Sequence, residues 1–370
     1  MKIAIEGNEA NTQNRVGVSN YCFYLIKEFA KLKTDNIKFE IILKNQPLDD
    51  LPTANNQLQY KVVKGSPLWL RYWVSLHLLK KRITRDYNLY FAPAHYTPKF
   101  IFHPLVVTIH DLAYIYFPNE FKKIDLYKLN NWTKEAVLKA KQIIAVSKTT
   151  KKDLIVNYQL PEEKIKVIYN GFNPPTNEYQ TQQLGFNLTE KKYFIFIGTI
   201  QPRKNIARLI KAFEIFKDKT NSEFKLVIIG KKGWFYNEIF QQANKSRYSS
   251  DIIFTDYVAD KVKNKLLSSA FAYINPGLYE GFGMPVLEAF YFKIPSAISF
   301  TGALPEVGGK AVEYFNPYKE QEIAKSMYNL YQYPKLRRTL IKEASNRLKE
   351  FSWKSTAEKT LEVFIANARN

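Results

Sequence analysis

The chain has 370 residues, of which 46% are hydrophobic, so it exceeds one ordinary domain and holds enough apolar material for two cores. Its net charge of +21 fits three situations: contact with nucleic acid, contact with an anionic membrane surface, or a lysine-rich surface that only water solvates. The single cysteine, Cys22, excludes an intramolecular disulfide and fits a reducing compartment.

Short apolar runs alternate with amphipathic helical patterns along the chain, which is typical of βα units with buried parallel strands. The predicted strands form two series: 2–6, 39–43, 89–91, 105–109, 142–146 and 166–169, then 193–197, 225–229, 252–255, 272–275 and 296–299. A polar stretch with two prolines separates the series. We therefore expect an α/β domain over 1–172, a linker over 173–190 and a second α/β domain over 191–350.

The N-terminal residues, Met1–Glu6, enter strand-like sequence directly and lack the apolar run of a signal peptide. No stretch approaches the roughly 20 apolar residues that a membrane-spanning helix needs. We expect a cytoplasmic protein.

A glycine loop, Arg15–Tyr21, opens a predicted helix over 21–31. A lone glycine before a helix is usually only a turn. Arg15 is a candidate anion contact, and a plain surface role explains it equally well.

The segment 66–85 combines aromatic residues and leucines with a basic end. Such a helix can lie at a membrane interface with its cations toward anionic lipid. The alternative is a helix that packs on the sheet of the first domain. If the segment contacts lipid, the protein lies peripherally on the cytoplasmic face of the membrane.

His110 and Asp111 end an apolar strand, at the edge where ligands of α/β sheets bind. A histidine there can donate a hydrogen bond to a sugar hydroxyl or a phosphate, although a structural histidine is the simpler alternative. His95 is a further candidate for contact with a ligand. His77 and His103 lack such a context, and we expect them to be structural.

The segment Phe196–Asn205 follows a predicted strand and leads into a helix, and it contains Arg203 and Lys204. Ligands bind outside the carboxyl ends of strands, so both cations lie where a pyrophosphate can bind. Two such cations would neutralise the negative charge of a bound pyrophosphate. A solvated loop with incidental charges is the alternative.

The segment Tyr279–Phe290 is the most informative part of the chain, because two carboxylates, Glu280 and Glu288, flank a glycine-containing turn. Gly283 permits close approach of the backbone to a ligand. Pro285 suits the first turn of a helix, and the free N–H groups at such a helix start attract anions. We expect the active site here.

Neither cysteine pairs nor clustered histidines occur at the spacing of metal ligands, so we expect no metal and no cofactor. No G-x-S-x-G elbow occurs either, which leaves a serine hydrolase unsupported.

These motifs resemble those of the retaining nucleotide-sugar glycosyltransferases of family 4, the group 1 glycosyltransferases. The similarity rests on the GFGMPVLEA sequence at 281–289, which follows Glu280 and contains Glu288, on PRKN at 202–205 and on TIHDL at 108–112. Further pieces match in order, among them Gly302–Val307. The resemblance implies the GT-B architecture, in which two Rossmann-like domains face a central cleft and a C-terminal helix, here 351–370, crosses back to the N-terminal domain.

The resemblance also implies the chemistry and the residues that carry it. A hexose, with mannose as our expectation, would pass from a GDP- or UDP-sugar to a glycan or lipid-linked acceptor of a cell-envelope polysaccharide, with retention and without a metal. The implied catalytic residues are Glu280, His110 and Lys204. The implied donor-binding residues are Gly17, Arg203, Lys204, Tyr257, Val258, Phe282, Gly283, Met284 and Glu288. The implied acceptor-side residues are Arg15, His95 and Asp111.

Two alternatives stay open at this point. One is another sugar-nucleotide enzyme of the same architecture, such as a glucan or sucrose-phosphate synthase, although the chain is short for those enzymes. The other is a basic nucleic-acid-binding protein, which charge alone supports, because no helix-turn-helix, zinc-finger or RNP-like sequence occurs.

Overall fold

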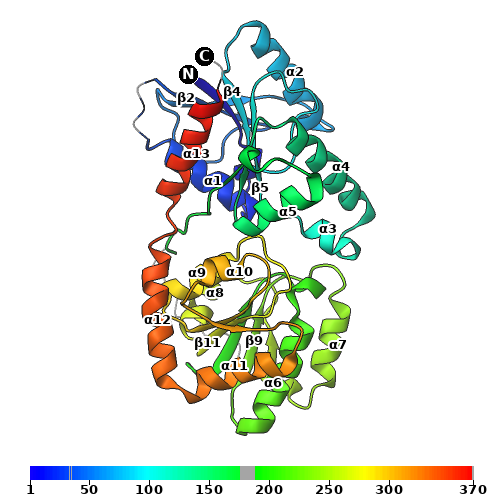
Figure 1. Ribbon diagram of the computed structural model, residues 1–370, viewed down its shortest axis with the longest axis vertical. Helices are drawn as coiled ribbons and strands as arrows, with labels where there is room; N and C mark the ends of the chain where they lie inside the picture. The colour runs from blue at the N-terminus through cyan, green and yellow to red at the C-terminus, as the bar shows by residue number, and fades with distance from the viewer. Residues whose placement is uncertain (33, 35, 176–187, 369–370) are drawn as a thin grey trace. The chain divides into compact units, whose positions relative to one another are not determined.

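The computed structural model describes residues 1–32, 34, 36–175 and 188–368, and its contacts divide the chain into two compact units (Figure 1). Unit 1 comprises Met1–Ile115, Lys122–Gly171 and Phe351–Asn370, and unit 2 comprises Tyr116–Phe121 and Phe172–Glu350. Each unit is a parallel sheet covered by helices, so the predicted α/β class with two parallel-sheet domains is confirmed. Most of the predicted linker, 176–187, lies outside the described residues.

Unit 1 contains a seven-stranded sheet of order β3-β2-β1-β4-β5-β6-β7. Its strands are β1 (Lys2–Glu6), β2 (Lys38–Leu43), β3 (Leu58–Val62), β4 (Leu89–Ala92), β5 (Leu105–Ile109), β6 (Gln142–Ala145) and β7 (Ile165–Val167). Its helices are α1 (Val18–Phe29), α2 (Trp69–Ile83), α3 (Ala113–Tyr116), α4 (Lys123–Lys139), α5 (Lys148–Tyr158) and α13 (Trp353–Asn367).

Unit 2 contains a six-stranded sheet of order β10-β9-β8-β11-β12-β13. Its strands are β8 (Tyr193–Ile197), β9 (Lys225–Ile229), β10 (Ile252–Phe254), β11 (Ala272–Asn275), β12 (Ser296–Ser299) and β13 (Glu313–Phe315). Its helices are α6 (Ile206–Thr220), α7 (Asn237–Lys245), α8 (Asp260–Ser268), α9 (Met284–Tyr291), α10 (Leu304–Gly308), α11 (Glu320–Gln332) and α12 (Pro334–Leu348).

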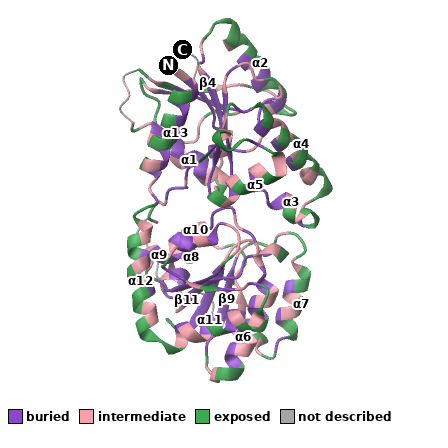
Figure 2. Ribbon diagram, viewed as in Figure 1, coloured by how far each residue is buried: buried purple, intermediate pink, exposed green. Residues whose placement is uncertain are grey.

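The central strands of both sheets read as continuous apolar runs because helices cover both of their faces. Ile3, Ile5 and Val107 in unit 1, like Phe194 and Ile228 in unit 2, are at most 1% exposed. In each unit the buried residues lie on the strands and on the inner sides of the helices (Figure 2). The hydrophobic cores therefore hold the strand ends, where loops begin, in fixed positions.

Each sheet has one place where the strand order reverses, between β1 and β4 in unit 1 and between β8 and β11 in unit 2. The loops that leave two such strands run in opposite directions and open a crevice at the carboxyl ends of the strands. The fold thus marks these two strand edges as places for a ligand.

Two edge strands, β3 and β13, were absent from the sequence-based prediction. Each pairs with a single neighbour, β2 and β12 respectively. Each contains one buried residue, Leu58 in β3 and Phe315 in β13, and its other residues are exposed or partly exposed, unlike the continuous apolar runs of the central strands. A search for buried parallel strands does not find such a pattern.

The C-terminal helix, α13, packs within unit 1. The ring of Phe364 lies 4.8 Å from that of Phe91, centroid to centroid, and Thr356 Oγ1 donates to the carbonyl of Tyr169 at 2.8 Å. Ser352 caps the helix by accepting from the N–H of Ser355. Among the described residues, no helix has the length and apolar character needed to span a membrane.

Candidate active site

An ion pair occupies the switch point of the sheet in unit 2. Lys204 follows β8, Glu280 follows β11, and these strands are neighbours. The Lys204 Nζ lies 2.5 Å from Glu280 Oε1, and the two side chains are 13% and 14% exposed. The structure therefore brings together a cation and a carboxylate that are 76 residues apart in sequence.

Hydrogen bonds hold the two loops that carry this pair against each other. The N–H of Leu278 donates to the carbonyl of Arg203 at 2.8 Å, and Arg203 Nη1 donates to the carbonyl of Tyr279 at 3.0 Å. The side chain of Asn205, which is buried, donates to the carbonyls of Pro276 and Pro317. The guanidinium of Arg203 thus fixes the backbone immediately before Glu280.

The backbone of Glu280 is also held from the loop that follows β12. The N–H of Ala303 donates to the Glu280 carbonyl at 3.0 Å. Gly302 has a φ of +59°, and a Cβ there would lie 2.8 Å from the backbone nitrogen of Glu280. Only glycine allows this close approach without strain. The loop after β12 therefore fixes the position of the Glu280 backbone, from which the carboxylate side chain extends.

The turn after Glu280 leads into α9, as the sequence predicts. Gly283 adopts a φ of +102° and caps the helix, Met284 is its first residue, and Pro285 lies in its first turn. Phe282, which is buried, completes the turn. The first turn of a helix has N–H groups without an intrahelical acceptor, and such groups favour an anion or a hydroxyl oxygen.

Glu288 lies on the second turn of α9 and forms an ion pair that the sequence did not predict. Lys263 of α8 places its Nζ 3.0 Å from Glu288 Oε1 and 3.2 Å from Asp260 Oδ1. Glu288 Oε2 is buried and has no hydrogen-bond partner among the described residues. One carboxylate oxygen is therefore positioned by Lys263, and the other is available to a hydroxyl donor.

A short segment that is contiguous in sequence with unit 1, Tyr116–Phe121, belongs by its contacts to unit 2. Glu120 in this segment is buried and accepts from the backbone N–H of Arg203. Burial raises the pKa of Glu120, although the charges of Arg203 and Lys204 oppose that shift. The carboxyl group of Glu120 thus lies beside Arg203 and Lys204, in addition to that of Glu280.

Tyr257 and Val258 lie in the loop between β10 and α8, where Tyr257 is largely exposed. The same loop leads to Lys263 and so, through its ion pair, to Glu288. The family resemblance implies that these two residues bind the donor. This loop follows the edge strand β10, and no described contact joins the two residues to Glu280 or Lys204.

In unit 1, His110 follows β5 and His95 follows β4, the adjacent strand. His110 Nε2 donates to the carbonyl of Pro93 at 2.8 Å, and its ring meets the edge of Tyr21 with centroids 4.8 Å apart. Burial lowers the pKa of His110, so the ring is neutral at pH 7. With Nε2 donating to Pro93, the neutral ring presents Nδ1 as an acceptor.

Burial, together with the neighbouring His110, lowers the pKa of His95 to about 4, although Asp111 opposes the shift. His95 Nδ1 is buried without a hydrogen-bond partner among the described residues. The carboxylate of Asp111 accepts from the N–H of Ala113 and so caps the short helix α3. Unit 1 therefore presents neutral imidazoles at its strand edge.

Gly17 caps α1 with a φ of +46°, and a Cβ at this position would meet nothing within 4 Å. Arg15 donates from Nη2 to Asp50 Oδ1 at 2.8 Å and from Nε to the carbonyl of Ala10. Its guanidinium also lies 4.0 Å above the ring of Phe23. Arg15 is thus part of an ion pair and fixes the start of the glycine loop.

The residues that sequence reasoning missed are Lys263, Glu120 and Gly302. Lys263 stands on an amphipathic helix among several other lysines, and Glu120 lies on a loop, so neither carries a local signal. Gly302 lies in a segment that matches the resembled family, but the pattern gives no reason for the match. In the described ranges, no group of three or more histidine, cysteine, aspartate or glutamate side chains has the arrangement of a metal site.

Two family models match the chain. Residues 179–347 match the model of "Glycosyl transferases group 1", and residues 16–175 match that of "Glycosyltransferase Family 4". The chain is 24% identical to the O-antigen chain mannosyltransferase B of Escherichia coli over 365 residues, which cover 94% of this chain and 95% of the relative.

Two solved structures share the fold over nearly the whole chain. Sucrose-phosphate synthase from Thermosynechococcus elongatus superposes with a TM-score of 0.74 at 14% identity and covers 99% of this chain and 98% of its own. Anabaena HepE in complex with UDP superposes with a TM-score of 0.73 at 16% identity and covers 99% and 100%. At these identities the likeness is one of architecture, and both structures have the GT-B fold.

Proposed function

We propose that this chain, which belongs to the group 1 glycosyltransferases, transfers a mannosyl residue from a nucleotide diphosphate sugar with retention of configuration. The acceptor is a glycan or lipid-linked sugar of a cell-envelope polysaccharide. The observation that carries the proposal is the Lys204–Glu280 pair at the switch point of unit 2. The choice of mannose is supported by the relative in E. coli, an O-antigen mannosyltransferase.

Lys204 stabilises the leaving group. When the bond between the anomeric carbon and the β-phosphate oxygen breaks, its electron pair goes to the diphosphate, and negative charge builds up on the phosphate oxygens. A partly buried ammonium group lowers the energy of that charge far more than a solvated one does. The N–H groups at the start of α9 add a second source of positive potential, so the reaction proceeds without a metal.

Glu280 stabilises the positive charge that develops on the sugar. The sugar becomes positively charged and oxocarbenium-like as the diphosphate leaves, and a carboxylate beside it stabilises that charge. The acceptor hydroxyl attacks from the face that the diphosphate has left, which retains the configuration. The hydroxyl proton passes to an oxygen of the departing diphosphate. Lys204 neutralises Glu280, and this pairing keeps both side chains oriented.

Glu288 binds the ribose hydroxyls of the donor through its carboxylate. Support comes from Glu288 Oε2, which is buried without a partner among the described residues while Lys263 holds Oε1. Phe282, Gly283 and Met284 offer backbone N–H groups to the sugar hydroxyls. Tyr257 and Val258 contact the base.

In unit 1 we assign Gly17 to the donor phosphates and His110 to a hydroxyl of the transferred sugar. A neutral His110 suits this role, because its Nδ1 accepts from a hydroxyl while Nε2–H stays on Pro93. His95, Asp111 and Arg15 line the acceptor side. A lipid-linked acceptor places the reaction at the cytoplasmic face of a membrane.

A panel of GDP-, UDP- and ADP-sugars in a thermal-shift assay tests the donor. A ligand that binds only the folded state raises its stability according to concentration relative to Kd, so the true donor stands out. We expect GDP-mannose or a UDP-hexose to shift the transition and to be turned over in the presence of EDTA. The NMR coupling of the product's anomeric proton then reports retention. A chain that no sugar nucleotide stabilises, or an inverted product, contradicts the proposal.

A further inference from the structure

The outer side of α2 carries a continuous row of exposed apolar side chains. Leu68, Tyr72, Leu76, Leu79 and Ile83 are spaced three or four residues apart, so they lie on one side of the helix. They are between 39% and 76% exposed. Single exposed apolar residues are ordinary on a protein surface, but a contiguous row of five marks an interaction site.

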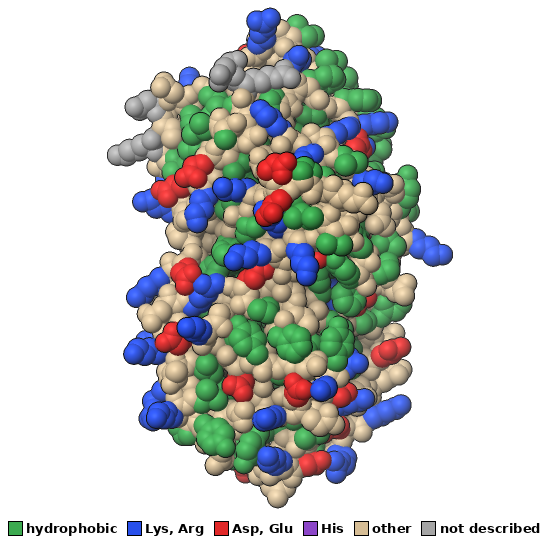
Figure 3. Space-filling view, in the orientation of Figure 1, with side chains coloured by type: hydrophobic (Ala, Val, Ile, Leu, Met, Phe, Trp, Pro, Cys, Tyr) green, Lys and Arg blue, Asp and Glu red, His purple; other side chains and the backbone are tan. Residues whose placement is uncertain are grey.

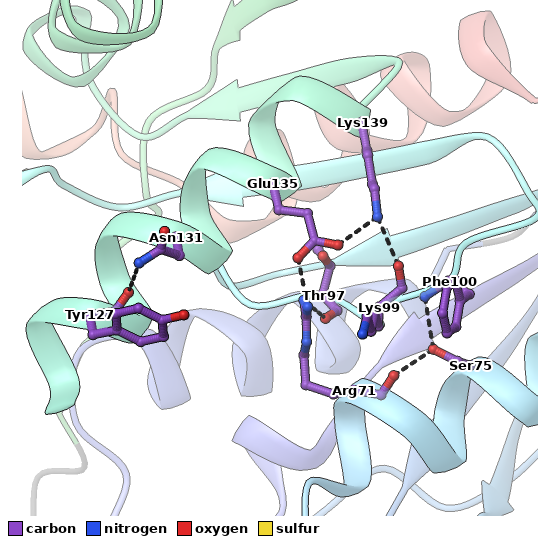
Figure 4. A network of polar contacts seen from close by, with 9 residues as sticks. All are labelled: Arg71, Ser75, Thr97, Lys99, Phe100, Tyr127, Asn131, Glu135 and Lys139. Carbon is purple, nitrogen blue, oxygen red and sulfur yellow. Dashed lines mark hydrogen bonds and ion pairs between the residues drawn. The ribbon is translucent and has the colours of Figure 1, made fainter.

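This row is not the side of α2 that packs on the core. The opposite side of the helix buries Trp69, Val74 and Leu78. Polar contacts fix that inner side as well: Arg71 pairs with Glu135 of α4 at 2.6 Å, and Glu135 in turn pairs with Lys139 (Figure 4). The inner side of α2 is therefore fully packed on unit 1, and it holds the exposed row in a fixed position on the surface.

The segment of the chain that carries the row is rich in basic residues and contains almost no acidic ones. Between Asp50 and Asp111 the chain contains eight lysines and arginines and only one acidic residue, Asp86, which pairs with Lys81. Lys80, Arg82 and Arg85 at the end of α2 are exposed. Hydrophobic side chains gather on the surface over α2, with lysine and arginine side chains beside them (Figure 3). The surface is apolar in its centre and cationic at its rim.

A basic cavity adjoins the end of the row. It has a volume of about 500 Å³ and is lined by Arg82, Lys139 and Lys141 together with the segment Ile101–Leu105. His103 in this wall is buried, and neither of its ring nitrogens has a hydrogen-bond partner among the described residues. In the part of the chain that the structure describes, no carboxylate lines the cavity, so its chemistry suits an anion such as a phosphate headgroup.

We propose that the outer face of α2, defined by Leu68, Tyr72, Leu76, Leu79 and Ile83, docks on a bilayer that contains anionic lipids. The apolar row enters the interfacial region, the cations at its rim meet lipid phosphates, and the cavity beside Arg82 receives a headgroup. This inference names the partner surface of the proposed enzyme. It rests on the proposed function only in requiring that the acceptor be membrane-bound.

The observations favour a bilayer over the other occupants. A second copy of the chain would set the cationic rims of two α2 faces close together, which costs electrostatic energy. Nucleic acid would use the cations but would leave the apolar row in water. The cavity lies where β5 begins, whereas His110 follows the end of the same strand, about 16 Å away along five residues. Docking there leaves the candidate site residues of unit 1 uncovered.

Vesicle flotation tests the proposal with the full chain. Vesicles of equal parts phosphatidylcholine and phosphatidylglycerol should carry the protein, and pure phosphatidylcholine should carry much less. The variant Leu76→Ser/Leu79→Ser should lower binding at least tenfold, and Lys80→Gln/Arg82→Gln should lower it by roughly fivefold for each cation removed. High salt should reproduce the effect of the charge variant only.

A matched control comes from α5 of the same unit, where Val156 and Lys152 are also exposed. The variant Val156→Ser/Lys152→Gln should float like the wild type. Donor-induced thermal shift, measured on every variant, reports folding and nucleotide binding separately from membrane binding. Thus a protein that floats but binds no sugar nucleotide contradicts the proposed function and leaves the docking surface standing.

Three results would overturn the inference. Flotation that survives both α2 variants, or that the α5 control abolishes equally, shows that α2 is not the docking face. Sedimentation as a dimer that Leu76→Ser/Leu79→Ser dissociates assigns the row to a second copy. Tight binding of nucleic acid that competes with vesicles and depends on Arg82 but not on Leu76 assigns the surface to a polyanion.

Discussion

The two units share one strand order around the switch point but differ in the side chains at that edge. In unit 2 the edge carries two ion pairs, Lys204–Glu280 and Lys263–Glu288, beside the first turn of a helix. In unit 1 the corresponding edge carries two neutral imidazoles, His95 and His110. The backbone supplies the crevice in both units, and the side chains decide which ligand it suits.

The difference follows from the chemistry of each half of the reaction. A diphosphate that leaves with its negative charge requires fixed cations, and cations in a partly buried loop require carboxylates nearby to remain stable. Sugar hydroxyls require only hydrogen-bond acceptors and donors, which neutral histidines supply without electrostatic cost. Under the proposed function, unit 2 therefore stabilises the charges that develop during the reaction.

The largest effect should come from breaking the Lys204–Glu280 pair. Lys204→Ala removes the cation that stabilises the leaving diphosphate, and we expect kcat to fall by about 10²–10³-fold. Glu280→Ala should reduce kcat to a similar extent while the far-ultraviolet circular dichroism stays unchanged. Lys192→Ala is the control, since Lys192 forms only an exposed pair with Glu223 in the same unit. Near-normal turnover by both site variants would refute the assignment.

A smaller effect, on donor binding, should follow from loss of the second pair. Lys263→Met leaves Glu288 without the ammonium group that orients it, so we expect the donor KM to rise about tenfold with kcat little changed. Lys263→Arg should restore much of the affinity. Lys265→Met on the same helix serves as control because Lys265 pairs with Glu190, away from Glu288. An equal fall in kcat for Lys263→Met would indicate a different role.

Acid should destabilise unit 1 more than unit 2, because all four histidines of the chain lie in unit 1. Burial lowers the pKa of His77, His95, His103 and His110, to about 4 for His95 and His103. Between the unfolded pKa of about 6.5 and these folded values, the unfolded chain binds more protons, so stability falls as the pH falls. Burial raises the pKa of Glu6 to about 8, and this group works in the opposite direction.

Hydrogen exchange measured between pH 7 and pH 5 can resolve this difference between the units. We expect protection in β1 and β5 to decrease relative to β8 and β11 after correction for the intrinsic exchange rate. His103→Phe should reduce the decrease in unit 1. Equal loss of protection in both units would show that the histidines do not govern the acid response.

The smallest effect should come from the cap of the C-terminal helix. Ser352 accepts from the N–H of Ser355, and its replacement by alanine removes one partner from the first turn of α13. We expect the free energy of unfolding to fall by about 1 kcal/mol, as measured by urea denaturation. Ser355→Ala, within the same helix but after the cap, should cost less. Transfer activity at low temperature should be unchanged.

Much of the fold can be predicted from the sequence, because buried parallel strands consist of uninterrupted apolar runs. The bounds of β1, β5, β8, β9, β11 and β12 agree with those expected. The strands β3 and β13 did not follow, because an edge strand pairs on one side only and its residues can stay polar. To predict that β3 and β13 are strands, one must already know that they pair with β2 and β12.

The site was partly predictable for the same reason. Lys204 and Glu280 each follow a predicted strand, and a match of short motifs marked both. The ion pair between Lys204 and Glu280 forms because β8 and β11 are neighbouring strands, and no local sequence pattern predicts which strands are neighbours. Lys263 and Glu120 reach the site through helix and loop placement alone, so their roles emerged only from the three-dimensional contacts.

The most direct test of the account is a calorimetric titration of the nucleotide sugar that the thermal-shift panel selects. The wild type and Lys204→Ala should be titrated under the same conditions, with Lys192→Ala as control. The account predicts that the Kd rises at least tenfold for Lys204→Ala and stays unchanged for Lys192→Ala, since only Lys204 lies at the switch point beside Glu280. An unchanged Kd for Lys204→Ala would contradict the claim that unit 2 holds the donor through this pair.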